Sequence, residues 1–263
     1  MNEEGSTVLT LQERCRELEA RNQALEEENR RLQNTIQSNN RLIRDTFTPY
    51  FTNEILDEIL SSEADLRIGG ERRHVTILFT DLRRSTELSE KMNAVDFIAM
   101  LNHYLEEMIE LVNAWGGNIL DFVGDAIVAV FGAPQDDDHA ARNAVACSVA
   151  MQCRMEAVNR WNRDRGFPDI AMGIGIHTGD AIVGNIGSKT RTKYDIIGRN
   201  VNLASRIEGQ TEGGDILIST ETLHEAGEQV RIDPQRQRLA RLKGVKGQIL
   251  LHDVRGFGTK TLP

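Results

Sequence analysis

The sequence lacks the features typical of nucleic-acid-binding, membrane-spanning and secreted proteins. Its 263 residues include 31 Lys and Arg against 40 Asp and Glu, a formal net charge of −9. No Lys- or Arg-rich run offsets this balance, so we expect no nucleic-acid partner. No apolar run reaches the about 18 residues of a membrane span. The first residues, MNEEGSTVLTLQERC, are too acidic and polar for a secretory signal.

Cysteine is also scarce. Cys15, Cys147 and Cys153 lack the spacing of metal ligands, and their odd number suits a reducing compartment. We therefore expect a cytoplasmic protein. Hydrophobic residues make up 40% of the chain and charged residues 27%, which is typical of a folded globular protein, and the length allows one domain plus an appendage.

A heptad pattern occupies the N-terminal part of the chain. The d positions hold Leu11, Leu18, Leu25 and Leu32, and the a positions hold Val8, Cys15, Asn22, Asn29, Ile36 and Ile43. Leucine at d favours a two-stranded parallel coil, and asparagine at a fixes its register. Residues 1–46 are therefore predicted to form a coiled-coil dimerisation helix. The alternative is a single solvated helix, because this segment is rich in helix-forming residues.

A joint is predicted over residues 47–73, since Pro49 interrupts the long helix and Gly69-Gly70 ends the segment. The globular domain is predicted over 74–257, with a tail at 258–263. Apolar runs at 75–81, 118–123, 126–132, 170–187 and 213–219 read as strands, and 85–115, 138–164 and 198–211 as helical segments. This alternation predicts an α+β, ferredoxin-like βαββαβ fold whose sheet is covered on one face.

Two acidic residues stand at strand ends. Asp81 closes the apolar run VTILFTD, and Asp125 lies in the Gly-Asp turn between two apolar strands. Desolvating a carboxylate is costly, so a buried strand that ends in one suggests a purpose. If the strands pair, the two acids converge and can bridge two divalent ions about 3.5–4 Å apart. The alternative is that both residues serve only as turn formers.

Four blocks together resemble the catalytic domain of class III adenylyl and guanylyl cyclases. They are ERRHVTILFTDLRRSTELSE, GDAIVAVFGAP, IGIHTGDAIVGNIG and YDIIGRNVNLASRIE, in the order that the family uses. The resemblance covers about residues 74–254, and the joint is similar to the transducing segment that precedes many bacterial members. It implies that a nucleoside triphosphate is converted to a 3′,5′-cyclic monophosphate, a second messenger.

The resemblance also implies residue roles. Asp81, Asp125 and the carbonyl of Leu82 would hold two Mg²⁺ or Mn²⁺ ions, and the turn with Arg84, Ser85 and Thr86 would bind phosphates. Arg84 and Ser85 replace the Gly and Phe commonly found there, so Arg84 either crowds the turn or contacts phosphate.

The same resemblance assigns the transition-state pair to Asn202 and Arg206, and a phosphate contact to Lys243 or Lys246. In the family, the Asn and Arg reach the metals of the partner chain. The resemblance therefore implies a homodimer joined through both the coiled coil and the catalytic domains.

Base recognition is where the pattern departs from the family. Adenylyl members commonly carry a Lys where this chain has Asp121 and an Asp where it has Asp195, whereas guanylyl members carry Glu at the first position. We expect ATP as substrate, with a guanylyl or pyrimidine cyclase as the alternative. A further alternative is an inactive signalling dimer, disfavoured because Asp81, Asp125, Asn202 and Arg206 are all present. A coiled-coil scaffold leaves the acidic strand ends unexplained.

Overall fold

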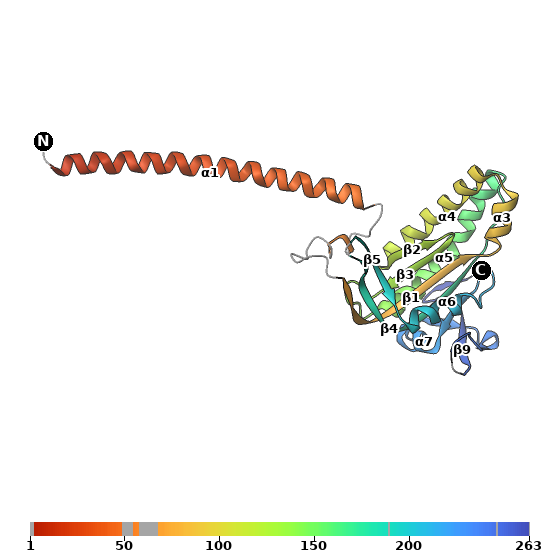
Figure 1. The fold of residues 1–263 in the computed structure, drawn as a ribbon. Helices are drawn as coiled ribbons and strands as arrows, with labels where there is room; N and C mark the ends of the chain where they lie inside the picture. The colour runs from red at the N-terminus through yellow and green to blue at the C-terminus, as the bar shows by residue number, and fades with distance from the viewer. Residues whose placement is uncertain (1–2, 49–54, 58–67, 189, 246, 263) are drawn as a thin grey trace. The chain divides into compact units, whose positions relative to one another are not determined.

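A computed structural model describes residues 3–48, 55–57, 68–188, 190–245 and 247–262 (Figure 1). The chain divides into two compact units, Met1–Leu56 and Asp57–Pro263. The first contains the long helix and the second contains the sheet with its covering helices. Most of the predicted joint, including Pro49, lies outside the described residues.

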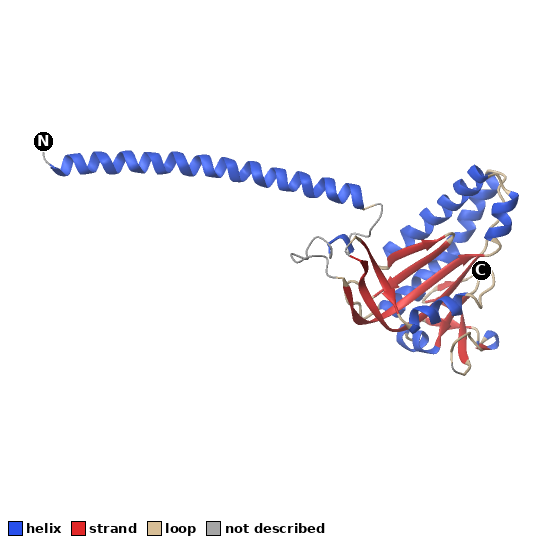
Figure 2. Ribbon diagram, in the orientation of Figure 1, coloured by secondary structure: helices blue, strands red, loops and turns tan. Residues whose placement is uncertain are grey.

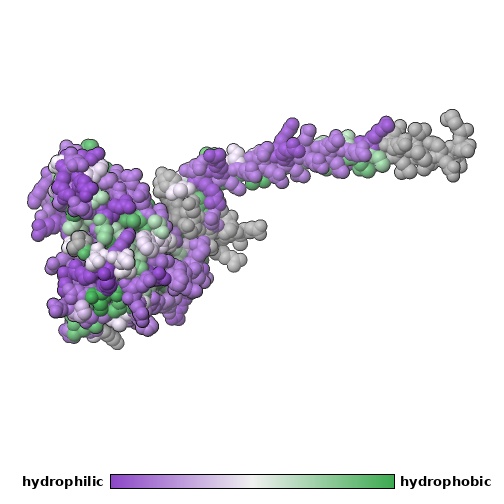
Figure 3. Space-filling view, turned by 180° about the vertical axis from the view of Figure 1, so that it is seen from behind, coloured by the Kyte–Doolittle hydropathy of each residue, from purple (hydrophilic) through white to green (hydrophobic). Residues whose placement is uncertain are grey.

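The N-terminal unit is dominated by one helix, α1 (Glu3–Phe47). Its surface is largely hydrophilic, with scattered apolar positions (Figure 3). Leu18, Leu25, Leu32 and Ile36, which belong to the predicted a and d positions, are each about half exposed. The helix confirms the secondary structure predicted for this segment. In a single chain the apolar stripe of this helix is exposed, as expected for a helix that pairs with a second one in a coiled coil.

The central sheet has the predicted βαββαβ arrangement (Figure 2). Strand β1 (Gly69–Leu82) lies between β3 (Ala126–Phe131) and β4 (Met172–Ser188), and β2 (Asn118–Val123) pairs with β3, all antiparallel. Helix α4 (Ala94–Ala114) connects β1 to β2, and α5 (Ala140–Asp164) connects β3 to β4. The order β4-β1-β3-β2 is that of a ferredoxin-like fold, so the predicted fold class is confirmed.

The sheet extends beyond this core. Strand β6 (Ile216–Ser219) is parallel to β4, and β9 (Ile249–Phe257) is antiparallel to β6. The smaller elements are α3 (Ser85–Lys91), β5 (Arg191–Ile197), α6 (Arg199–Glu208), α7 (Thr220–Ala226), β7 (Val230–Ile232), η1 (Pro234–Arg236), β8 (Arg238–Ala240) and β10 (Lys260–Thr261). Strand β5 pairs with the distal half of β4 and forms a hairpin with it.

Helices pack on both faces of the sheet. The prediction that only one face would be covered was therefore wrong. On one face, Met172, Ile174 and Ile176 of β4 join the main core with α4 and α5. Alternate residues of β4 point to the opposite face, where Gly173 and Gly175 stand. A Cβ on Gly175 would lie 2.2 Å from the amide nitrogen of Glu208, so α6 packs directly on the strand backbone there.

Strand β1 begins earlier than the predicted domain boundary at residue 74. It starts at Gly69, which pairs with Asn185 of β4, so the Gly69-Gly70 pair opens the strand instead of ending the preceding segment. A Cβ on Gly70 would lie 2.8 Å from the carbonyl oxygen of Val183. The glycine therefore permits close strand pairing, which a reading of glycine as a chain breaker did not anticipate.

Candidate active site

The structure brings the two predicted metal-binding acids together. Thr80 pairs with Ile127, so the end of β1 lies beside the turn that carries Asp125. The Leu82 amide donates to Asp125 Oδ2 over 2.9 Å, which aims this carboxylate at the strand end that bears Asp81. Pairing of β1 with β3 therefore converts two acids 44 residues apart in sequence into one acidic site, as the sequence predicted.

The acidic pair is electrostatically strained. Burial, followed by the negative charges of Asp125 and Glu208, raises the pKa of Asp81 to about 6. The carboxylates of Asp81 and Asp125 are close enough to share a hydrogen bond when one is protonated. Two ionised carboxylates at this separation repel each other, so the site favours either a proton or a cation between them.

Arg83 partly offsets this negative charge, a role that the sequence did not reveal. Its Nη2 donates to the Asp81 carbonyl and to Asp81 Oδ2, both over 3.1 Å, and it also pairs with Glu208 at the C-terminal end of α6. Burial raises the pKa of Glu208, and Arg83 opposes that shift. Arg83 therefore links the acidic strand end to α6.

The donor set fits a pair of hard divalent cations. Within the described residues, no group of three or more His, Cys, Asp or Glu side chains is arranged to hold a metal ion. Asp81 and Asp125 would supply two carboxylates, and the predicted third ligand, the carbonyl oxygen of Leu82, would add to them. A Mg²⁺ or Mn²⁺ ion accepts such a sparse oxygen set because it commonly retains waters and binds substrate phosphates. The raised pKa of Asp81 marks the charge that such ions would neutralise.

The turn after β1 positions the predicted phosphate-binding residues. Arg84 is the N-cap of α3, with φ 61° and ψ 26°, which is the left-handed conformation that favours glycine. Ser85 and Thr86 form the first positions of α3, so their amides lie at a helix N-terminus. The sequence left open whether Arg84 crowds the turn or contacts phosphate. The structure accommodates Arg84 in this left-handed conformation, with an exposed side chain.

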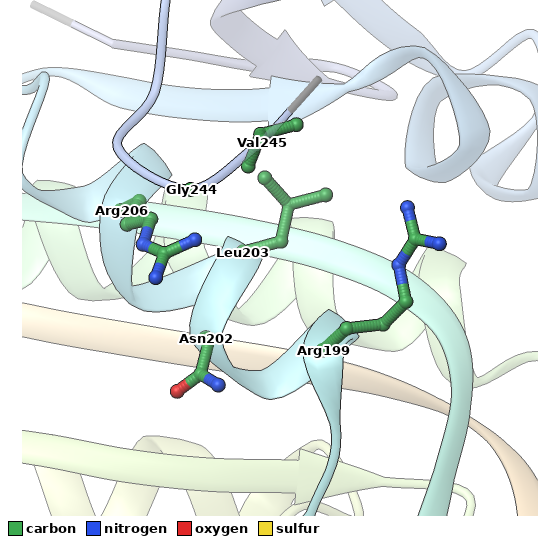
Figure 4. A pocket seen from close by; sticks show the side chains of 6 residues that line it. All are labelled: Arg199, Asn202, Leu203, Arg206, Gly244 and Val245. Carbon is green, nitrogen blue, oxygen red and sulfur yellow. The ribbon is translucent and has the colours of Figure 1, made fainter.

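A second group of predicted residues lines a cavity of about 510 Å³ above α6 (Figure 4). The cavity is lined by Arg199, Asn202, Leu203, Arg206, Gly244 and Val245. The predicted pair, Asn202 and Arg206, therefore shares one surface, as the spacing of four residues indicated. The Arg206 guanidinium lies 3.5 Å from where a Cβ of Gly244 would stand, and Gly244 has φ +71°. A Cβ at this distance would make an ordinary van der Waals contact, so it is the left-handed backbone conformation that favours glycine here.

The acidic pair and the cavity lie on different faces of α6. Glu208 reaches Arg83 beside the acidic pair, whereas Arg206 borders the cavity. Residues two apart on a helix are separated by about 200° around its axis. The predicted catalytic arginine therefore faces away from the side of α6 that meets the acidic pair of its own chain.

Lys243, a predicted phosphate contact, is exposed in the segment just before Gly244. Its position beside the cavity is compatible with that role. The alternative residue, Lys246, lies outside the described residues.

The two predicted base-recognition acids meet through a lysine that the sequence reading missed. Lys193 Nζ lies 2.6 Å from Asp121 Oδ2 and 3.3 Å from Asp195 Oδ2. Lys193 and Asp195 are two apart on β5 and so share a face of that strand. A signal was present in the alternation of TKYD, but only the β4–β5 hairpin places Lys193 beside β2.

Across the described residues, no helix combines the length and the apolar character that crossing a bilayer requires.

Comparisons with known proteins agree with this geometry. Residues 70–256 match the family described as the adenylate and guanylate cyclase catalytic domain. The chain is 34% identical over 216 residues to "Adenylate cyclase 1" of Rhizobium meliloti (strain 1021), covering 80% of this chain and 32% of that protein. It is 35% identical over 186 residues to "Adenylate cyclase" of Anabaena cylindrica, covering 66% and 36%. The chain thus spans about a third of the length of these curated relatives.

Solved structures show the same likeness. The guanylyl cyclase Cya2 aligns with a TM-score of 0.72 and 43% identity, over 74% of this chain and all of that chain. The adenylyl cyclase CyaB from P. aeruginosa aligns with a TM-score of 0.69 and 36% identity, over 72% and 97%.

Proposed function

Because the chain belongs to the adenylate and guanylate cyclase catalytic-domain family, we propose that it is a homodimeric nucleotide cyclase that converts ATP to 3′,5′-cyclic AMP and pyrophosphate. The observation that carries this proposal is the presence, in one domain, of the Asp81–Asp125 acidic pair and the cavity lined by Asn202 and Arg206. The reaction requires both the acids that would bind metal ions and the residues that would stabilise the transition state.

The reaction forms one bond and breaks another. The ribose 3′-oxygen attacks the α-phosphorus, the bond from that phosphorus to the bridging oxygen of the β-phosphate breaks, and the 3′-hydroxyl proton leaves to solvent. Divalent ions, when bound by Asp81, Asp125 and the Leu82 carbonyl, supply positive charge that favours the 3′-alkoxide and the leaving pyrophosphate. The amides at the N-terminus of α3 would bind phosphate oxygens.

Arg206 and Asn202 act on the reacting centre from the other half-site. The guanidinium of Arg206 would stabilise the negative charge that grows on the α-phosphate oxygens, and the amide of Asn202 would orient the ribose. Placement at a cavity large enough for part of a nucleotide supports these roles. A fixed, always charged guanidinium costs little reorganisation during the reaction.

The homodimer follows from the division of the site. Arg206 and Glu208 lie on different faces of α6, so the catalytic arginine of one chain would complete the acidic pair of a second chain. The exposed leucines of α1 support a parallel coil that holds two catalytic domains at high effective concentration. Replacing Leu25 and Leu32 by Glu should therefore dissociate the protein in sedimentation experiments, whereas Glu at the exposed positions Arg30 and Arg31, outside the a and d positions, should leave the seam intact.

ATP is favoured as the substrate because the curated relatives at 34% and 35% identity are adenylate cyclases and because Asp195 suits the adenine amino group. A guanylyl cyclase is the second candidate, since Cya2 is 43% identical and Asp121 takes the place of a family lysine.

Product analysis by mass spectrometry tests the function. Purified protein is incubated with ATP, GTP, CTP or UTP and with Mg²⁺ or Mn²⁺, beside the variants Asp81→Ala and Lys91→Met. We expect cyclic AMP from wild type and from Lys91→Met, which alters an exposed ion pair with Glu87, and none from Asp81→Ala. Absence of every cyclic product from verified dimers would instead favour the inactive signalling dimer.

A further inference from the structure

Lys193 lies between Asp121 and Asp195, the two acids that the family pattern assigns to base recognition, and the pattern gives it no role. We infer that Lys193 is the specificity-determining residue of this pocket, and that its ammonium group donates to the ring N1 of adenine while a flanking carboxylate accepts from the 6-amino group. The inference rests on the proposed function and adds to it the residue that reads the base.

The three side chains are held in a defined order. Asp121 Oδ1 accepts from the Phe122 amide over 2.9 Å, and Asp195 Oδ1 accepts from the Ile196 amide over the same distance. Each backbone contact leaves the Oδ2 atom of its carboxylate for Lys193. The ammonium therefore lies between two oriented acceptors.

The cluster is accessible to a ligand. The side chains of Asp121, Lys193 and Asp195 are 50%, 41% and 34% exposed. Lys193 carries three N–H donors, and a base edge can therefore share it with the carboxylates. Its two carboxylate neighbours raise the pKa of Lys193 despite partial burial, so it is a donor at neutral pH.

Charge argues against a phosphate as the ligand of this cluster. One ammonium beside two carboxylates leaves a net negative charge, which repels an anion. A neutral base that offers both donors and acceptors suits the cluster, because each charged side chain can then keep a hydrogen-bond partner when the base binds.

The order of donors and acceptors selects the base. Reading from Asp121 through Lys193 to Asp195, the pocket presents acceptor, donor, acceptor. Adenine offers its amino donor next to the N1 acceptor, which matches two neighbouring members of this order. Guanine can pair O6 with Lys193 and N1–H with one carboxylate, but its 2-amino donor then has no acceptor in the order and its N7 acceptor faces the other carboxylate. Adenylyl members commonly carry a lysine where this chain has Asp121. Lys193, on the neighbouring strand β5, would take over the role of that lysine.

The experiment compares Lys193→Met with Lys193→Arg, and with Lys91→Met as the control for losing an exposed lysine ion pair. Two readouts are measured: kcat/KM for ATP and GTP, and the affinities of 3′-deoxy-ATP and 3′-deoxy-GTP, which lack the attacking hydroxyl. The ratio of adenine to guanine affinity is decisive, because loss of general charge balance would weaken both nucleotides alike.

We expect Lys193→Met to reduce the adenine preference by about tenfold to a hundredfold, the effect of losing a charge-assisted hydrogen bond. Lys193→Arg should retain part of it, and Lys91→Met should retain all of it. The triphosphate of 2,6-diaminopurine riboside, whose added 2-amino group presents donor, acceptor, donor, should bind wild type more tightly than ATP does.

An unchanged adenine-to-guanine ratio in Lys193→Met, with melting temperature preserved, would overturn the inference even if the protein is an adenylyl cyclase. A wild type that prefers the guanine analogue would overturn it too. If wild type cyclises no nucleotide, the proposed function fails, but the affinities of the 3′-deoxy analogues still decide the role of Lys193.

Discussion

The two halves of the candidate site differ in charge and in how they are built. The half-site at the end of β1 collects three carboxylates, from Asp81, Asp125 and Glu208, and Arg83 forms ion pairs with Asp81 and Glu208. The half-site on α6 has the opposite character, since its cavity is lined by two arginines, Arg199 and Arg206, with no acidic residue among its lining side chains.

This difference indicates that the halves are complementary and separately incomplete. The acidic half attracts cations, and the arginine half suits an anionic transition state. Since Arg206 and Glu208 diverge around α6, one chain presents both halves without closing them on each other. Two copies would supply two complete sites, and variants that damage one half at a time test this division.

The largest effect is expected from variants of different halves. Asp81→Ala and Arg206→Ala should each lower cyclase activity by about a hundredfold to a thousandfold or more, because each removes a group that we propose stabilises the transition state. Coexpressing the two variants should restore about a quarter of wild-type activity, since half of the random dimers then carry one intact site. Initial rates of cyclic nucleotide formation measure this.

The control pairs two variants of the same half. Coexpressed Asp81→Ala and Asp125→Ala chains leave every acidic half-site damaged, so activity should stay at background. Recovery in this control, or none in the mixed-half experiment, would show that the halves do not act between chains.

Removing the cation of the acidic half should cost stability. Arg83→Met leaves Asp81 and Glu208 without their ion-pair partner, and we expect the free energy of unfolding to fall by about 1–3 kcal/mol in metal-free protein. Mn²⁺ should recover more stability in the variant than in wild type. Denaturant titrations with and without Mn²⁺ measure both quantities.

Arg163→Met is the matched control, because Arg163 pairs with Glu156 and Asp169 on the exposed side of α5. Such surface pairs contribute little to stability, because water screens both charges. Equal losses at positions 83 and 163 would mean that Arg83 is an ordinary surface charge.

The acidic half also predicts a pH dependence. The folded-state pKa of Asp81 is about 6, above the ordinary aspartate value of 3.8. The folded state therefore binds the proton more tightly, and its stability falls as pH rises from about 4 to about 6. Asp81→Asn should be more stable than metal-free wild type above pH 6, and the difference should vanish below pH 4.

The expected gain from Asp81→Asn is about 1 kcal/mol, because solvent screens a side chain that is 38% exposed and reduces the about 3 kcal/mol implied by the full shift. Thermal unfolding between pH 4 and pH 8 in chelator measures it. A gain that is independent of pH would assign the effect to packing and not to the proton.

The smallest effect concerns the turn between the halves. Arg84 adopts a left-handed backbone that glycine adopts without strain, so Arg84→Gly should raise the free energy of unfolding by about 0.5 kcal/mol after the entropy cost of glycine. Glu87→Gly, inside α3, should instead lower it by about 1 kcal/mol. Denaturant midpoints of the two variants compare directly, and a loss at position 84 would show that the Arg84 side chain contributes more than its backbone strain costs.

Local sequence patterns determined the elements and part of the chemistry. Apolar alternation and heptad spacing predicted α1, the βαββαβ core and the turn acids Asp81 and Asp125, because each signal lies within one element and its caps. The four-residue spacing of Asn202 and Arg206 likewise predicted that they share a helix face. The predicted boundary at residue 74 and the single covered face were less accurate, because close backbone approaches at Gly70 and Gly175 decide both.

Tertiary structure alone decided which charges meet. Arg83 joins Glu208 across 125 residues and Lys193 joins Asp121 across 72, through contacts of α6 with the sheet and of the β4–β5 hairpin with β2. A charged side chain carries no periodic signal that names its partner, and its reach of several ångströms allows many partners. Only the packing of strands and helices selects one, and that selection placed a cation beside the acids predicted to bind metal and a donor between the acids predicted to recognise the base.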